Sequence, residues 1–214
     1  MKLTLIGLAL VVAASAGATQ FFNSAAPANN AATRTSFLAA AGVANGQYFE
    51  DFESYALNTN MEGVVLGGGL TLHNSGSGSL LIKGAGGFGG SNPIDARGLQ
   101  HNESQYLEII LPTPAVYFAA YDIDQTTTTI IVTYSDSTKQ NFNLESTGGS
   151  GNSAEFFGLV TENGLHIAKL QFDASGDGSW GLDNFEYGVE PVPEPATLSL
   201  VGVAAVAAFR RRKK

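Results

Sequence analysis

The chain of 214 residues contains no cysteine, one tryptophan and few charged residues. Without cysteine it can form no disulfide and no thiolate metal site, and it has no cysteine nucleophile. Charged residues make up 14% of the sequence, whereas glycine occurs 26 times. Sparse charge and frequent glycine favour an all-β protein with many turns over a helical bundle.

Basic residues are scarce in the body of the chain. Six of the 11 lie at the two ends, which leaves five basic against 18 acidic residues and a net charge of −13 for the body. A surface this acidic repels a phosphate backbone, so we expect no nucleic-acid partner. It suits solubility and divalent cations. The five are Arg34, Lys83, Arg97, Lys139 and Lys169.

The first 18 residues have the pattern of a signal peptide. Lys2 supplies a positive start, residues 3–12 are apolar, and small residues follow up to Ala18. This order predicts export by the Sec machinery and cleavage after Ala18. The alternative is an N-terminal membrane anchor, for which the apolar run is short.

The other end combines a proline-flanked glutamate, an apolar stretch and a basic terminus. Residues 198–209 would span about 18 Å as a hydrophobic helix, which is marginal for a bilayer. The basic cluster should stay cytoplasmic and stop translocation. We therefore favour a processing signal over a permanent tail anchor. The stop-transfer residues are Arg210, Arg211, Arg212, Lys213 and Lys214.

Residues 191–214, with the V-P-E-P-A-T motif, the short apolar helix and the arginine-rich end, resemble the PEP-CTERM sorting domain. The resemblance implies an exosortase that recognises Pro193, Glu194 and Pro195 and removes the tail after transient membrane insertion. The mature protein would then reach the cell surface or the extracellular polymer. Such proteins often accompany exopolysaccharide and biofilm formation.

Between these ends we expect a flexible leader and one folded domain. Residues 19–33 are mostly small and polar, which is typical of a mobile segment. A short helix should cover residues 36–41, capped by Thr35 or Ser36 and ended by Gly42. The domain proper should span residues 34–190.

About nine or ten short strands without a long amphipathic helix predict an antiparallel β-sandwich, with a jelly roll as first choice. The segments 51–53 and 181–185 resemble those that open and close secreted jelly-roll domains of the carbohydrate-binding-module type. The strands are expected at 47–53, 64–73 (a pair), 79–83, 105–111, 115–123, 127–134, 140–144, 155–160, 165–172 and 180–187.

Two carboxylate sets are candidate calcium ligands. In the modules that the body resembles, a carboxylate near the first strand and an aspartate on the last strand bind calcium together, which here implies Glu53 and Asp183. Calcium prefers hard oxygens and would offset the repulsion of two buried carboxylates. Asp173 and Asp177 begin a calcium-loop pattern that lacks its final glutamate. Solvated edge carboxylates and a tight β-turn are the respective alternatives.

Catalysis is the weaker interpretation of the acidic group Glu50, Asp51 and Glu53. On a strand, Asp51 and Glu53 would share a face and could act as acid and base on a glycosidic bond. No other pattern supports the required separation of their pKa values. We therefore predict no enzyme, but an exported structural or adhesive surface protein. The alternatives are a calcium-stabilised carbohydrate-binding module and a secreted glycan hydrolase.

Three aromatic residues could stack against sugar rings if they are exposed: Tyr117, Tyr121 and Trp180. Aromatic residues in a β-sandwich more often belong to the core. The core is therefore the expected place of each.

Overall fold

The computed structural model describes residues 18–76, 78–88, 91–102, 106–123, 127–145, 154–173 and 179–189. The predicted signal peptide, the apolar helix at 198–209, the sorting motif and the basic cluster lie outside these residues.

The described residues form eleven strands, one α-helix and two short 3-10 helices. Every strand pairing among them is antiparallel, which confirms the expected all-β antiparallel class. The elements are β1 (Thr19–Asn23), η1 (Pro27–Asn29), α1 (Asn30–Ala41), β2 (Tyr48–Glu50), η2 (Gly67–Gly69), β3 (Thr71–Asn74), β4 (Ser79–Lys83), β5 (Gly98–Asn102), β6 (Leu107–Ile123), β7 (Thr127–Tyr134), β8 (Lys139–Glu145), β9 (Ala154–Thr161), β10 (Ile167–Asp173) and β11 (Trp180–Val189).

The long strand β6 belongs to both layers of the fold. Its first half pairs with β3 and β10, and its second half pairs with β9 and β11. We call the order β3-β6-β10-β7-β8 sheet I and the order β1-β9-β6-β11 sheet II; β2 and the β5-β4 pair extend sheet II beyond β11. Pro112 and Pro114 lie where β6 passes from one sheet to the other.

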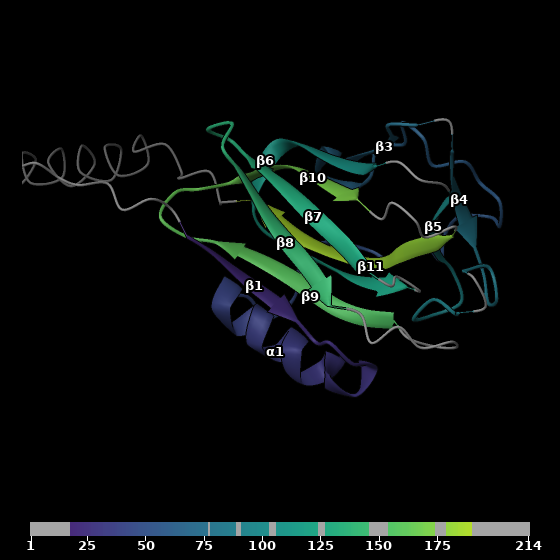
Figure 1. The fold of residues 1–214 in the computed structure, drawn as a ribbon, viewed down its shortest axis with the longest axis horizontal. Helices are drawn as coiled ribbons and strands as arrows, with labels where there is room; N and C mark the ends of the chain where they lie inside the picture. The colour runs from purple at the N-terminus through teal and green to yellow at the C-terminus, as the bar shows by residue number, and fades with distance from the viewer. Residues whose placement is uncertain are drawn as a thin grey trace, which may run out of the picture.

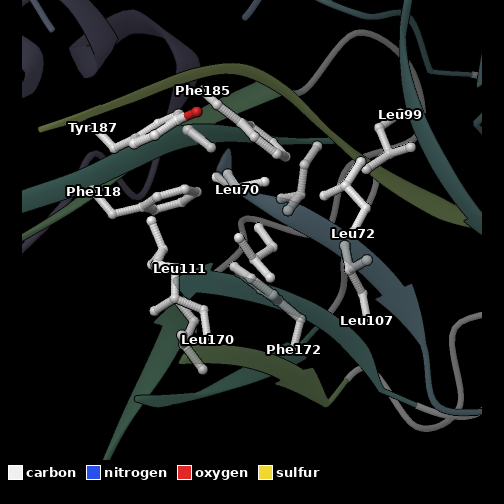
Figure 2. Close-up of a cluster of buried hydrophobic side chains, with 14 of the residues drawn as sticks. Leu70, Leu72, Leu99, Leu107, Leu111, Phe118, Leu170, Phe172, Phe185 and Tyr187 are labelled. Atoms are coloured by element: carbon white, nitrogen blue, oxygen red, sulfur yellow. The ribbon is translucent and has the colours of Figure 1, made fainter. Parts of the chain in front are cut away.

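The main hydrophobic core fills the space between the two sheets, as Figure 2 shows for leucine and aromatic side chains. Phe157 of sheet II contacts Phe172 of sheet I with ring centroids 5.7 Å apart, and Phe172 lies 6.2 Å from Trp180 of sheet II. All three side chains are fully buried. The body is therefore a β-sandwich, stabilised by burial of apolar side chains from both layers.

Helix α1 forms a third layer on the outer face of sheet II (Figure 1). Its fully buried Phe37 contacts Tyr117 and Phe156 at centroid distances of 5.9 and 5.6 Å. Gly158 makes this approach possible, because a Cβ there would lie 2.5 Å from Phe37 Cδ2. Gly42 ends the helix in the left-handed conformation, with φ of 70°, as expected.

The flexible leader predicted for residues 19–33 is wrong. Strand β1 pairs along its whole length with β9. The ring of Phe21 on β1 also contacts the ring of Phe142 on β8, with centroids 5.1 Å apart. Helix α1 begins at Asn30 instead of residue 36. The Asn30 amide group pairs with the main chain of β9, donating to Ala154 O (2.8 Å) and accepting from Phe156 N–H (2.9 Å). These long-range contacts order residues whose composition suggests mobility.

Four strand expectations also need correction. Of the pair expected at 64–73, only β3 is a strand, and Val65 makes a single isolated bridge to Thr71. The segments 105–111 and 115–123 form one strand, and β5 was not expected, because polar Gln100 and His101 weaken its pattern. Strand β2 ends at Glu50, three residues early. Within the described residues, no helix has both the length and the apolar character needed to cross a membrane.

Candidate functional site

Two carboxylates hold the segment 94–97 against the edge of sheet II. Glu53 Oε1 accepts hydrogen bonds from the N–H groups of Ala96 (2.8 Å) and Arg97 (2.6 Å). Asp183 Oδ2 accepts one from Ile94 N–H (2.9 Å). The structure thus brings the two predicted calcium ligands Glu53 and Asp183 to one segment, where backbone donors satisfy part of their charge.

Glu53 lies in a tight turn and not on a strand. Glu50 Oε1 accepts from Phe52 N–H (2.8 Å), and Asp51 Oδ1 accepts from Glu53 N–H (3.1 Å). Phe52 has a φ of 60° and is fully buried, with its ring 5.0 Å from that of Phe185. The expectation that Asp51 and Glu53 share a strand face is therefore wrong, since the chain turns directly after Glu50.

Asp183 is fully buried on β11. Burial raises the pKa of its carboxyl to about 7, although the hydrogen bonds from Ile94 and Asn184 N–H favour the ionised form. The nearby charge of Asp95 acts in the same direction as burial. A buried carboxylate of this kind is stabilised by any cation that reaches it.

Asn184 links the two aspartates. Its Nδ2 donates to Asp95 Oδ2 (3.3 Å), and its backbone has a φ of 50°. The side chain is 8% exposed, and its Oδ1 accepts no hydrogen bond from any of the described residues. An orphaned acceptor oxygen on a residue that follows Asp183 and contacts Asp95 is a hard donor of the kind that calcium takes. Neither Asp95 nor Asn184 carried a sequence signal for this role.

Of the other two predicted ligands, Asp173 is not part of this cluster. Asp173 ends β10 in sheet I and is paired with Thr129, whereas Asp183 lies in sheet II. Asp177 lies outside the described residues. Among the residues that the structure describes, no group of three or more His, Cys, Asp or Glu side chains could hold a metal ion.

An open cleft of about 330 Å³ lies beside this cluster, between the start of α1 and the segment 92–94. Tyr121 is partly buried and packs against the cluster of Phe88, Ile123 and Ala154, of which Ala154 also lines the cleft. Burial raises the pKa of the Tyr121 hydroxyl, and the charges of Arg34, Glu186, Asp95 and Asp183 also act on it. The lining of the cleft itself is made of apolar side chains and two asparagine amides. Its lining residues are Pro27, Asn30, Asn92, Pro93, Ile94 and Ala154.

An ion pair that the sequence did not reveal connects α1 to β11 near the cleft. Arg34 donates from Nε to Glu186 Oε1 (2.5 Å) and from Nη2 to Glu186 Oε2 (2.9 Å). Glu186 is only 1% exposed, and its carboxylate raises the pKa of Arg34. This two-pronged geometry is the strongest that a guanidinium and a carboxylate form.

The expectation that the candidate sugar-stacking aromatics lie in the core is confirmed for two of them. Trp180 is fully buried and Tyr117 is 3% exposed, so neither presents a ring face to solvent. Tyr121 is the exception, because it is only partly buried.

Comparisons with solved structures give partial likenesses to carbohydrate-binding proteins. A variant of CBM29-2, a family 29 carbohydrate-binding module in complex with mannohexaose, is 13% identical with a TM-score of 0.37, covering 64% of this chain and 92% of that one. An exo-β-agarase is 13% identical (TM-score 0.39; 72% of this chain, 26% of that one). CsCBM6-3 from Clostridium stercorarium, in complex with cellobiose, is 16% identical (TM-score 0.27; 66% and 93%). With TM-scores below 0.5, none of these likenesses carries an argument about function.

No curated protein matches the chain. The comparison with protein families matches residues 191–213 to the PEP-CTERM protein-sorting motif, which confirms the resemblance seen in the sequence. This motif indicates an exported protein that an exosortase processes at the cell surface. Residues 191–213 of this chain are a PEP-CTERM sorting motif.

Proposed function

We propose that this chain is a structural or adhesive protein of the cell surface or extracellular matrix, delivered by the Sec machinery and an exosortase to an exopolysaccharide or biofilm setting. The observation that carries the proposal is the sorting motif at residues 191–213, which begins two residues after the end of β11 at Val189. In this proposal the motif directs the chain to the cell surface. The acidic β-sandwich, for which we propose jelly-roll connectivity, is the part of the chain that remains there.

Substitution Glu194→Ala tests delivery in a bacterium that has an exosortase. The unchanged chain should appear at the surface in shortened form, whereas the variant should remain in the membrane fraction at full length. Glu190→Ala, which lies just outside the matched residues, is the control and should be processed normally. Equal processing of all three chains would contradict the proposed sorting route.

Polysaccharide is the partner that we propose for the body. The cleft supports this, because its two asparagine amides can pair with sugar hydroxyls, and the partly buried Tyr121 packs against the cluster that contains the lining residue Ala154. A glycan array probed with residues 19–189 should give a bound glycan, and Tyr121→Ala should weaken it. An array without any bound glycan would contradict the proposal that the body binds polysaccharide.

Calcium is the structural cofactor that we propose. Asp95, Asp183 and the Asn184 oxygen would hold it, with Glu53 positioning the segment 94–97 that carries Asp95. Three side-chain oxygens are fewer than the six to eight that calcium takes, so backbone oxygens and water would supply the others. When bound, the ion supplies positive charge opposite a buried carboxylate.

We also propose that the protein is not an enzyme. The carboxylates of Glu50, Asp51 and Glu53 each accept backbone N–H groups of the turn or of the segment 94–97, which is a structural use. Hydrolysis of any glycan that is lost on substitution Glu53→Gln in a folded protein would overturn this proposal.

A further inference from the structure

Strand β8 is the last strand of sheet I, and within the described part of the chain only β7 pairs with it. Its seven residues, Lys139–Glu145, follow β7 in continuous register, without a bulge and without proline. An unpaired strand edge exposes backbone donors and acceptors, so proteins commonly shorten, bulge or cover such edges. The free edge of β8 is long and regular and is therefore suited to pairing with a further strand.

Two other edge strands are covered by the chain itself. At the outer edge of β3, Gly63 N–H donates to Leu72 O (2.8 Å). At the outer edge of β4, Met61 N–H donates to Leu80 O (2.9 Å). Strand β1 has only five residues, and its outer edge borders a hollow of about 470 Å³ beside α1. Among the described strands, β8 thus has the longest edge that no other described segment covers.

The outward backbone groups of β8 belong to its odd-numbered residues. At the turn between β7 and β8, Tyr134 N–H donates to Thr138 O (3.0 Å). Hydrogen-bonded and non-bonded pairs alternate in an antiparallel ladder, so the even-numbered residues of β8 bond to β7. The N–H and C=O groups of Lys139, Asn141 and Asn143 therefore point away from β7. No described residue forms a hydrogen bond with these backbone groups.

The sequence of β8 is complementary to itself when two copies run antiparallel. If Phe142 stands opposite Phe142 of a second copy, Asn141 stands opposite Asn143. In the same register, Lys139 stands opposite Glu145, so that unlike charges face each other at both ends of the pairing. Odd-numbered positions meet only odd-numbered positions, so each outward N–H faces an outward C=O of the second copy.

Neighbouring registers lose one of these matches. A shift by one residue pairs odd-numbered with even-numbered positions, whose backbone groups already bond to β7. A shift by two residues keeps the backbone pairing but places Lys139 opposite Asn143 or beyond the end of the strand. Backbone pairing and charge therefore favour the same register, and the partner that satisfies both is a second copy of this chain.

We propose that two copies of the body join through β8 in this antiparallel register, so that sheet I continues from one copy into the other. The contact is short, so association depends on concentration. Salt that screens the repulsion between the two acidic bodies supports it. The inference goes beyond the proposed function and requires neither the sorting motif nor calcium.

The first test changes the charges at the two ends of the pairing. Residues 19–189 contain every described strand and both layers of the sandwich, and sedimentation equilibrium measures their association. Lys139→Glu and Glu145→Lys each place like charges opposite each other twice and should weaken dimerisation about tenfold. An equal mixture of the two variants restores both unlike pairs and should associate like the unchanged body. A mixture that stays monomeric would overturn the register, and an unchanged body that stays monomeric would overturn the proposal.

The second test removes a backbone donor from the free edge. Asn141→Pro deletes an outward N–H and no hydrogen bond to β7, so the body should fold while dimerisation falls at least tenfold. Asn141→Thr keeps the N–H and is the matched control, which should dimerise like the unchanged body. Normal dimerisation of the proline variant would contradict the proposal. A body that never dimerises and that Asn141→Pro destabilises in urea would instead indicate that another segment of the same chain covers this edge, which also overturns it.

Discussion

Replacing Arg34 with methionine should lower the free energy of unfolding of residues 19–189 by about 3 kcal/mol, because a buried charge would lose its partner. Glu186 is 1% exposed, and its two carboxylate oxygens are both bound by the Arg34 guanidinium. Methionine has a similar length and packs well, so the expected loss of stability comes from the buried Glu186 carboxylate that no longer has a partner. Urea titration followed by tryptophan fluorescence measures it, since the single Trp180 reports on the core.

Two variants separate the buried charge from general damage to α1. Adding Glu186→Gln to the Arg34→Met variant should recover part of the lost stability, because the uncompensated charge is gone. Lys169→Met breaks the Lys169–Glu108 ion pair, whose N–O distance is 3.1 Å and whose side chains are 30% and 15% exposed. This more exposed pair should contribute less than about 1 kcal/mol. Similar losses for Arg34→Met and Lys169→Met would contradict the argument.

Local composition predicted the strands whose patterns are strongest. Residues 127–134 form β7 with the expected bounds, because a run of threonine, isoleucine and valine favours extended structure. The core position of Trp180 was predicted from the general tendency of large aromatic side chains to be buried. The C-terminal strands β9, β10 and β11 lie within two residues of their expected bounds.

The expected strands 105–111 and 115–123 are separated by a segment with two prolines, but both belong to β6. Pro112 and Pro114 normally interrupt a strand, because they donate no backbone hydrogen bond. Here they lie where β6 changes partners, so their missing donors fall between two sets of pairings. One strand of 17 residues results. Only the tertiary arrangement distinguishes this strand from two separate ones.

Contacts between distant residues explain the other errors. Strand β1 and the first turn of α1 are ordered by β9, which lies more than 120 residues later, and their own composition gives no sign of it. The candidate site is similar. Glu53 and Asp183 were predicted from a resemblance and do act on one segment, whereas Asp95 joins Asn184 across 89 positions. No local pattern predicts such a pairing.

The buried carboxyl of Asp183 should make the stability of the body depend on pH in chelator. Burial raises its pKa to about 7, against 3.8 for the ordinary side chain, so the folded state binds the proton more tightly than the unfolded state. Its contribution to stability is complete below about pH 4 and is lost as the pH rises through 7. The difference between the two pKa values corresponds to a loss of about 4 kcal/mol. Urea titrations of residues 19–189 between pH 4 and pH 8.5 measure it.

Calcium should remove much of that loss, because the ion would offset the ionised carboxylate. At a concentration a hundredfold above its dissociation constant, a ligand that binds only the folded state adds about 2.7 kcal/mol. The gain at pH 8.5 should disappear in Asp183→Asn and persist in Asp173→Asn, which lies on the other sheet. Asp183→Asn should also flatten the pH dependence, while the smaller effect of Glu50, whose pKa burial also raises, remains. Identical unfolding curves in calcium and in chelator at pH 8.5 would rule out the ion, and the steep pH dependence in both would then show Asp183 to be an uncompensated buried acid.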